Sequence, residues 1–167
     1  GFAVRGDFGL NIYNSRAMHY LRANGIDSQL LSFEMTLPQI RDVSKAVPAE
    51  VLIYGRLPLM LMENCVIKNR TCTCTCQTGT VRLVDRVGEE FPVVKDPGTC
   101  RNVLLNGKKL YLLDKKESFR GMGLWALRLQ FTTENAGEVD RVLSEYRLGA
   151  RFEPGSCTRG LYNRGVE

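Results

Sequence analysis

The chain begins with an apolar-rich, strand-like run that leads into an amphipathic segment. The run covers residues 2–14 and ends in asparagine and serine, residues that commonly precede a helix. The next segment, 15–24, has apolar residues at helical spacing, with Ser15 as its expected N-cap and Gly25 as its expected stop. Together these segments predict a first strand–helix (βα) unit.

The same rhythm is repeated once more. Residues 28–35 form a second short apolar run, and residues 36–47 have apolar positions on one side of a helix. Thr36 and Gln39 have the spacing of a capping box, and Pro48 ends the helix. We therefore predict a second βα unit.

A third apolar run, residues 49–62, reads as one strand buried on both faces, as parallel strands are. After it the rhythm changes, and residues 63–123 are predicted to form a β-rich, cysteine-containing insertion. Within this insertion, residues 81–94 resemble a hairpin. The pair Asn106-Gly107 lies between two apolar runs and predicts a two-residue hairpin turn.

The last βα unit is predicted from residues 125–132, a strand, and residues 134–146, a helix. Four such units with right-handed crossovers predict the C-terminal half of a (β/α)₈-type barrel, in a single α/β domain over residues 1–167. A small open doubly wound sheet is the competing architecture. We expect the chain to be a fragment of a longer protein.

Composition and charge narrow the choice of partners and compartment. The 167 residues are 44% hydrophobic, enough for one core, and the net charge of +5 is compatible with an anionic partner such as RNA. No apolar run approaches the roughly 20 residues that a membrane helix needs, and no signal-peptide pattern is present. We expect a cytoplasmic protein without membrane contact.

Functional residues of both architectures lie at the carboxyl ends of the strands. Asp7, Glu34 and Arg56 are the candidate catalytic residues, because charged side chains beside apolar strands usually have a partner or ligand. Helix capping is the favoured role for three further polar residues at these ends, Asn14, Thr132 and Glu134.

The cysteines are concentrated in one part of the chain. The six are Cys65, Cys72, Cys74, Cys76, Cys100 and Cys157. Four thiolates bind zinc or an iron–sulfur cluster, and the absence of paired CxxC knuckles favours a cluster. In an extended segment Cys74 and Cys76 project to the same side, so we expect them to bind one metal centre with Cys65 and Cys100. Cys72 is the expected spare, although it could replace Cys74.

Other readings of the reactive residues are less favoured. The clustered cysteines could be free thiols in a loop, and Cys157 is expected to be an isolated thiol. The single histidine, His19, lies within the first predicted helix as a surface residue. The sequence contains no HExxH or GxSxG motif, so no protease machinery is visible.

Several segments resemble one known family. The chain is similar to the C-terminal part of peptidase family U32, the collagenase-like proteases, over nearly its whole length. The resemblance is carried by GDFGLNIYNSRAMHYL, LLSFEMTLPQI, IYGRLPLMLMENC, LVDRVGEEFPVV, CRNVLLN and TRGLYNRGVE.

The resemblance implies a barrel-type α/β domain and two classes of activity. Members of the family are linked to collagen degradation or to oxygen-independent hydroxylation of RNA or a small aromatic quinone precursor. It also implies a [4Fe–4S] cluster on Cys65, Cys74, Cys76 and Cys100, for which zinc is the alternative.

It further implies that the N-terminal half of the barrel lies outside this chain. We therefore expect either that missing half or a homodimer to cover the exposed barrel edge, and RNA or a peptide as substrate. A metal-stabilised peptidase and a noncatalytic fragment are the alternatives to a hydroxylase.

Overall fold

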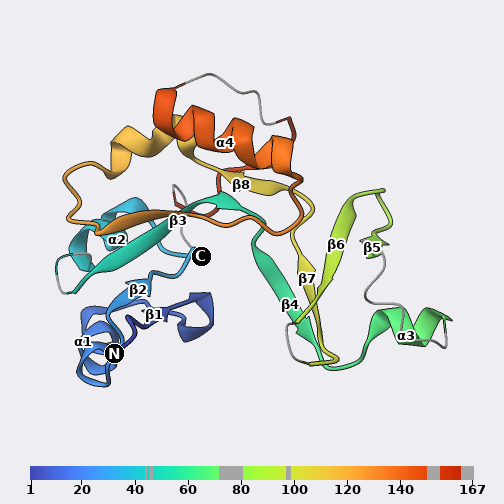
Figure 1. The fold of residues 1–167 in the computed structure, drawn as a ribbon, viewed down its shortest axis with the longest axis horizontal. Helices are drawn as coiled ribbons and strands as arrows, with labels where there is room; N and C mark the ends of the chain where they lie inside the picture. Colours follow the sequence, from blue (N-terminus) through green and yellow to red (C-terminus); the bar gives the residue numbers. More distant parts are fainter. Residues whose placement is uncertain (44, 46, 72–80, 97–98, 150–154, 163–167) are drawn as a thin grey trace.

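The computed structural model consists of two β-sheets that carry helices at their edges and faces (Figure 1). The structure describes residues 1–43, 45, 47–71, 81–96, 99–149 and 155–162. In Figure 1, helix α4 lies above the larger sheet, and the smaller sheet lies to the right of the larger one. Cys72, Cys74 and Cys76 lie outside the described residues, so the expected positions of these thiols stay predictions.

Parallel pairing in chain order organises the larger sheet. Strand β1 pairs with β2, β2 with β3, and β3 with β9, and all three pairings are parallel. The strands are β1 (Arg5–Gly6), β2 (Ser28–Leu30), β3 (Ala49–Gly55) and β9 (Ala126–Leu129). The helices that follow them are α1 (Ser15–Ala23), α2 (Leu37–Val43) and α4 (Ala136–Leu148). The prediction of an α/β fold with a parallel sheet is thus confirmed.

The first predicted strand is interrupted. After β1 the chain forms a short 3₁₀ helix, η1 (Phe8–Leu10), and Asn11 takes a left-handed backbone conformation with φ of 45°. Extended pairing resumes only as an isolated bridge between Ile12 and Leu31. The expected single strand over residues 2–14 was therefore too long.

Local hydrogen bonds explain where the first two helices begin. Asn14, rather than the expected Ser15, is the N-cap of α1, and its side-chain oxygen accepts from the Ala17 backbone N–H at 2.9 Å. The capping prediction for Asn14 is confirmed. The side-chain oxygen of Gln39 accepts from the Thr36 backbone N–H at 2.8 Å, which is the expected contact of the capping box.

The smaller sheet is antiparallel and has the strand order β4-β7-β6-β5. Its strands are β4 (Pro58–Met62), β5 (Val81–Val84), β6 (Glu90–Lys95) and β7 (Asn102–Leu105), and α3 (Val66–Thr71) follows β4. The β5–β6 hairpin agrees with the prediction. The expected third strand is two strands, because the chain turns at Arg56 and Leu57 from one sheet into the other.

The hairpin predicted at Asn106-Gly107 does not form. Strand β7 belongs to the smaller sheet, whereas β8 (Lys109–Tyr111) joins the larger sheet antiparallel to β3 and parallel to β10 (Cys157–Thr158). The Asn106 N–H donates to the Leu57 carbonyl at 2.8 Å, so the two passages between the sheets lie side by side. Burial of the β8 residue Leu110 in the larger core favours this arrangement over a local hairpin.

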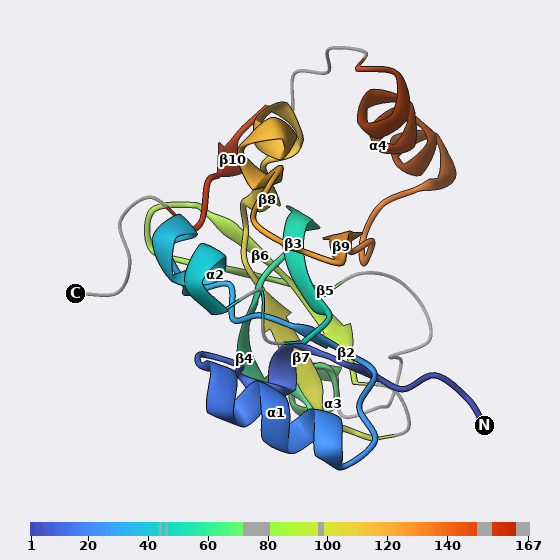
Figure 2. The same cartoon turned by 90° about the vertical axis from the view of Figure 1, so that its left-hand side faces the viewer.

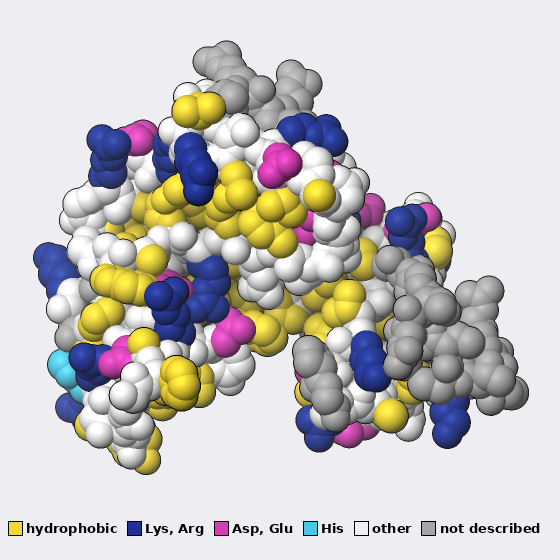
Figure 3. Space-filling model, in the orientation of Figure 1, with side chains coloured by type: hydrophobic (Ala, Val, Ile, Leu, Met, Phe, Trp, Pro, Cys, Tyr) yellow, Lys and Arg dark blue, Asp and Glu magenta, His cyan; other side chains and the backbone are white. Residues whose placement is uncertain are grey.

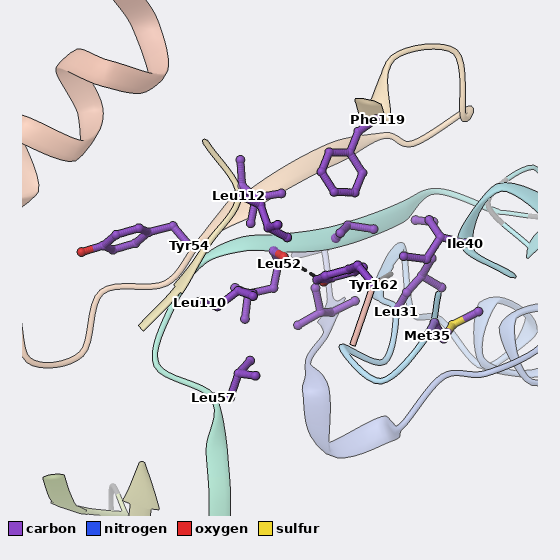
Figure 4. Packing of buried hydrophobic residues seen from close by; sticks show 14 of the residues in the cluster. Leu31, Met35, Ile40, Leu52, Tyr54, Leu57, Leu110, Leu112, Phe119 and Tyr162 are labelled. Carbon is purple, nitrogen blue, oxygen red and sulfur yellow. Dashed lines mark hydrogen bonds between the residues drawn. The ribbon is translucent and has the colours of Figure 1, made fainter. Parts of the chain in front are cut away.

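The main core lies between the larger sheet and its helices (Figure 2). It ties distant segments together, because Tyr162 is buried there and donates from its hydroxyl to the Leu52 carbonyl at 2.8 Å (Figure 4). The Phe119 ring meets the Tyr162 ring edge to face, with centroids 6.1 Å apart. The end of the described chain is thus packed into the centre of the domain.

Within the described ranges, none of the helices has both the length and the apolar character needed to cross a membrane. In the space-filling view an open notch separates the α1 region from the smaller sheet (Figure 3). In the described part of the chain the two sheets are joined by two passages, one after β3 and one after β7 (Figure 1).

Candidate functional site

Arg56 occupies the corner where β3 ends and the chain passes into the smaller sheet. Its Nε donates to the Thr133 hydroxyl at 3.1 Å, and its Nη1 donates to the Asn106 carbonyl at 2.7 Å. Nη1 also donates to the carbonyl of Gly107. These acceptors come from the β9–α4 and β7–β8 connections, so the guanidinium holds three segments at one point.

A lysine and two carboxylates lie at the same end of the sheet. Lys109 Nζ is 2.9 Å from Glu134 Oε1 and 3.4 Å from Glu138 Oε1. The side chain of Glu134 is fully buried, and its other oxygen accepts from the backbone N–H groups of Thr132 and Thr133. The Tyr54 hydroxyl donates to Glu134 Oε1 at 3.3 Å, which completes a compact ionic cluster.

Burial and the contacts within this cluster shift the pKa values of its members. Burial alone would raise the pKa of Glu134, but the bond from Lys109 and the backbone N–H of Thr132 outweigh it, so the pKa is lowered. Burial alone would lower the pKa of Lys109, yet its bond to Glu134 and that carboxylate's charge raise it. Burial and the charge of Glu134 raise the pKa of Tyr54. At neutral pH the lysine and the carboxylate are therefore both charged.

The cluster borders two adjoining hollows of about 480 and about 170 Å³. Both are lined by Arg56, Gly107, Lys109 and Glu138. The larger hollow extends toward the β5–β6 hairpin, and the smaller one is lined by Tyr54, Tyr111, Val142 and Ser156. We refer to the two together as the corner cleft.

Two of the expected metal ligands lie at one end of the smaller sheet. Cys65 follows β4 and Cys100 precedes β7, and these strands pair with Met62 opposite Asn102. The Val66 N–H donates to the Asn102 side-chain oxygen at 2.9 Å, which joins the two segments. Both cysteines are free thiols. In the described part of the chain, no group of three or more His, Cys, Asp or Glu side chains is placed to hold a metal ion.

A comparison with protein families tests the family resemblance that the sequence segments suggested. A model of peptidase family U32 matches residues 2–151, nearly the whole chain. The chain belongs to peptidase family U32. No curated protein and no solved structure matched this U32 chain. The match includes β1 to β9, and therefore the cysteine-bearing insertion, and it ends before β10.

The three residues expected to act together in the U32 chain each have separate partners. Asp7 caps η1 and lies 2.7 Å from Arg128, whereas the exposed Glu34 accepts from the Tyr13 hydroxyl at 3.2 Å. Among the described residues, neither of these carboxylates contacts Arg56. Of the three, only Arg56 lines the corner cleft.

Sequence reasoning missed Lys109, which belongs to this cleft. Its strand, β8, was assigned to a local hairpin, so nothing placed the lysine next to Glu134. Glu134 itself was expected to serve as a helix cap, but Asn135 is the N-cap of α4 and Glu134 binds the lysine instead. The predicted surface position of His19 agrees with its exposure on α1.

Proposed function

We propose that this U32 chain is part of an iron–sulfur-dependent enzyme of the oxygen-independent hydroxylase type, acting on RNA or on a small aromatic substrate. The observation that supports it most is the convergence of cysteine-bearing segments on one end of the smaller sheet. Cys65 and Cys100 flank the paired residues Met62 and Asn102 there.

Strand β5, which follows the remaining cysteine segment along the chain, begins near the same end of the smaller sheet. Lys95 of β6 pairs with Asn102, and Val81 of β5 pairs with Val93, two residues from that end. We infer that the segment between Thr71 and Val81, which contains the other three clustered cysteines, supplies the remaining ligands.

The donor set fits a [4Fe–4S] cluster, because thiolates are the usual ligands of such clusters. Cys65, Cys74, Cys76 and Cys100 would hold it, with Cys72 able to replace Cys74. When bound, a cluster supplies one-electron chemistry that thiols and carboxylates lack. Zinc is the alternative occupant of the same four thiolates.

The substrate site of this enzyme is proposed to lie at the carboxyl ends of the parallel strands. In this proposal the parallel sheet is half of a (β/α)₈-type barrel, whose active sites form at those ends. Asp7, Glu34 and Arg56 would bind and orient the substrate from β1, β2 and β3. The other half of the barrel, or a second copy of the chain, would cover the open edge of the sheet.

Purification without oxygen tests the cofactor. We expect a brown protein with iron and acid-labile sulfide in equal amounts. Cys74→Ala and Cys76→Ala should lose the chromophore, and Cys157→Ala, the matched control outside the cluster, should keep it. Cys72→Ala shows whether that thiol is a ligand. A colourless protein with one zinc per chain would overturn the iron–sulfur assignment.

A peptidase is the second candidate, and the family to which the chain belongs favours it. In that case the cysteines hold a structural metal, and cleavage of casein or collagen should survive replacement of all five clustered cysteines by serine. Loss of cleavage together with loss of the metal, in a variant that remains folded, would argue against a purely structural site.

A further inference from the structure

Arg56 carries a positive charge that no carboxylate neutralises within the described residues. Its hydrogen-bond acceptors are a hydroxyl and two backbone carbonyls, all of them uncharged. The other two cations of the corner cleft differ in this respect. Lys109 is paired with Glu134 and Glu138, and Arg82 lies 2.7 Å from Glu90.

The contacts of Arg56 also fix the direction of its unused donors. Nε and Nη1 are bound to Thr133 and to the β7–β8 turn, whereas Nη2 makes no hydrogen bond to any described residue. A guanidinium is always charged and presents its N–H groups in a rigid plane that suits the oxygens of carboxylate and phosphate. Because the side chain is only partly exposed, its charge is less screened than that of a surface arginine.

We propose that the corner cleft is an oxyanion-binding subsite in which Arg56 binds the carboxylate or phosphate group of an organic ligand. This rests on the proposed function for placing the substrate at the carboxyl ends of the strands, but it does not require a metal cluster. The smaller hollow receives the apolar part of the ligand, because Tyr54, Tyr111 and Val142 line it.

The carboxylate of Glu89 should repel an anion in the cleft, so removal of its charge gives a second, independent test of the subsite. It lines the larger hollow beside Arg56, and among the described residues it forms no ion pair. A Cβ atom at Gly107 would lie 2.4 Å from Glu89 Oε1, so the glycine allows this carboxylate to approach the corner. Its negative charge lowers the affinity of the cleft for anions.

Binding is measured on the metal-free full chain with three probes: benzoate, phenyl phosphate and inorganic phosphate. Ligand-observed NMR titration gives each Kd. We expect one of the two organic anions to bind more tightly than inorganic phosphate, and the better of the two identifies carboxylate or phosphate as the recognised group.

Three variants decide the proposal. Arg56→Gln should weaken binding at least tenfold, Glu89→Gln should tighten it severalfold, and Arg22→Gln, which removes a cation on α1, should leave it within twofold.

Circular dichroism establishes whether Arg56→Gln is folded. If that variant is unfolded, Glu89→Gln alone decides. Native affinity in folded Arg56→Gln, or no tightening in Glu89→Gln, would overturn the subsite. Neither result bears on the cluster, since no metal is present.

Discussion

Arg128 of β9 binds Glu50 of β3 through two donors that converge on one carboxylate oxygen. Nε and Nη2 lie 2.9 and 2.7 Å from Glu50 Oε2, and the Ser28 hydroxyl donates to Oε1 at 2.6 Å. Glu50 is only 2% exposed. A buried carboxylate of this kind depends on its partners, since its charge has lost its hydration.

Replacement of Arg128 by glutamine should therefore destabilise the domain strongly. Among the described residues, the change leaves the buried Glu50 charge with Ser28 as its one remaining side-chain partner. The free energy of unfolding should therefore fall by about 3–5 kcal/mol. Urea titration followed by circular dichroism measures this loss.

Two controls separate the buried pair from charge loss in general. Arg22→Gln removes an exposed pair with Asp27 and should cost less than about 1 kcal/mol. The double variant Glu50→Gln/Arg128→Gln should recover part of the lost stability, because no buried charge remains. A double variant as unstable as the single Arg128→Gln would show that the carboxylate charge is not the cause.

Gly55→Ala should disrupt the end of β3. Gly55 has φ of 137°, and a Cβ atom there would lie 2.4 Å from the Gln130 backbone carbonyl, so β3 and β9 would have to separate. We expect a loss of about 3 kcal/mol or more in unfolding free energy. Gly88→Ala has a similar backbone requirement, with φ of 87°, but open space around it, and should cost only about 1 kcal/mol. Equal losses in the two variants would exclude the steric explanation.

The Lys109–Glu134 pair should limit stability at both extremes of pH. The pKa of Glu134 is lowered from 4.5, so its contribution is present above about pH 4.5 and is lost as the pH falls through the lower native value. The pKa of Lys109 is raised from 10.5, so its contribution is present below about pH 10.5 and is lost as the pH rises through the higher native value.

Unfolding free energies of Lys109→Met measured across this range test the assignment. At neutral pH the variant should lose about 2–3 kcal/mol, because Glu134 keeps only uncharged hydrogen-bond donors. The difference from the native protein should shrink as Glu134 becomes protonated at acid pH. A difference that stays constant down to pH 3 would contradict the ion pair as its source.

Tyr162→Phe should lower the unfolding free energy by about 1 kcal/mol, because it leaves the Leu52 carbonyl without the hydroxyl donor. Tyr162→Ala removes the ring as well and should cost about 3–5 kcal/mol. Thermal unfolding of both variants measures the contribution of the chain end. If both behave like the native protein, this contact does not support the core.

The sequence predicted the parallel part of the fold because its signals are local. Alternating apolar runs and capped helices give β1, β2, β3 and β9 in chain order, and neighbouring βα units pair in that order. The turn signal at Asn106-Gly107 was misleading for a different reason. A turn sequence shows that the chain bends there, but only burial decides which sheet receives each strand that follows.

The part of the candidate site that could be predicted from sequence is the residue that directly follows an apolar strand. Arg56 follows an apolar strand directly, and it lies in the corner cleft as a charged residue at such a position should. Lys109 could not be found in this way, because its partner Glu134 is brought to it by the antiparallel pairing of β8 with β3. Contacts between segments so distant in sequence depend on topology rather than on local pattern.

The two side-by-side passages between the sheets have a mechanical consequence. Because the chain enters the smaller sheet after Arg56 and leaves it at Asn106, any rocking of that sheet relative to the parallel strands must bend both passages at once. Arg56, on the first passage, binds the second through the Asn106 and Gly107 carbonyls and is also bonded to Thr133 in the β9–α4 connection. An anion that binds Arg56 and holds it in place would therefore restrict movement of the smaller sheet. The end of that sheet that carries Cys65 and Cys100 would be affected most, because it lies farthest from the two passages.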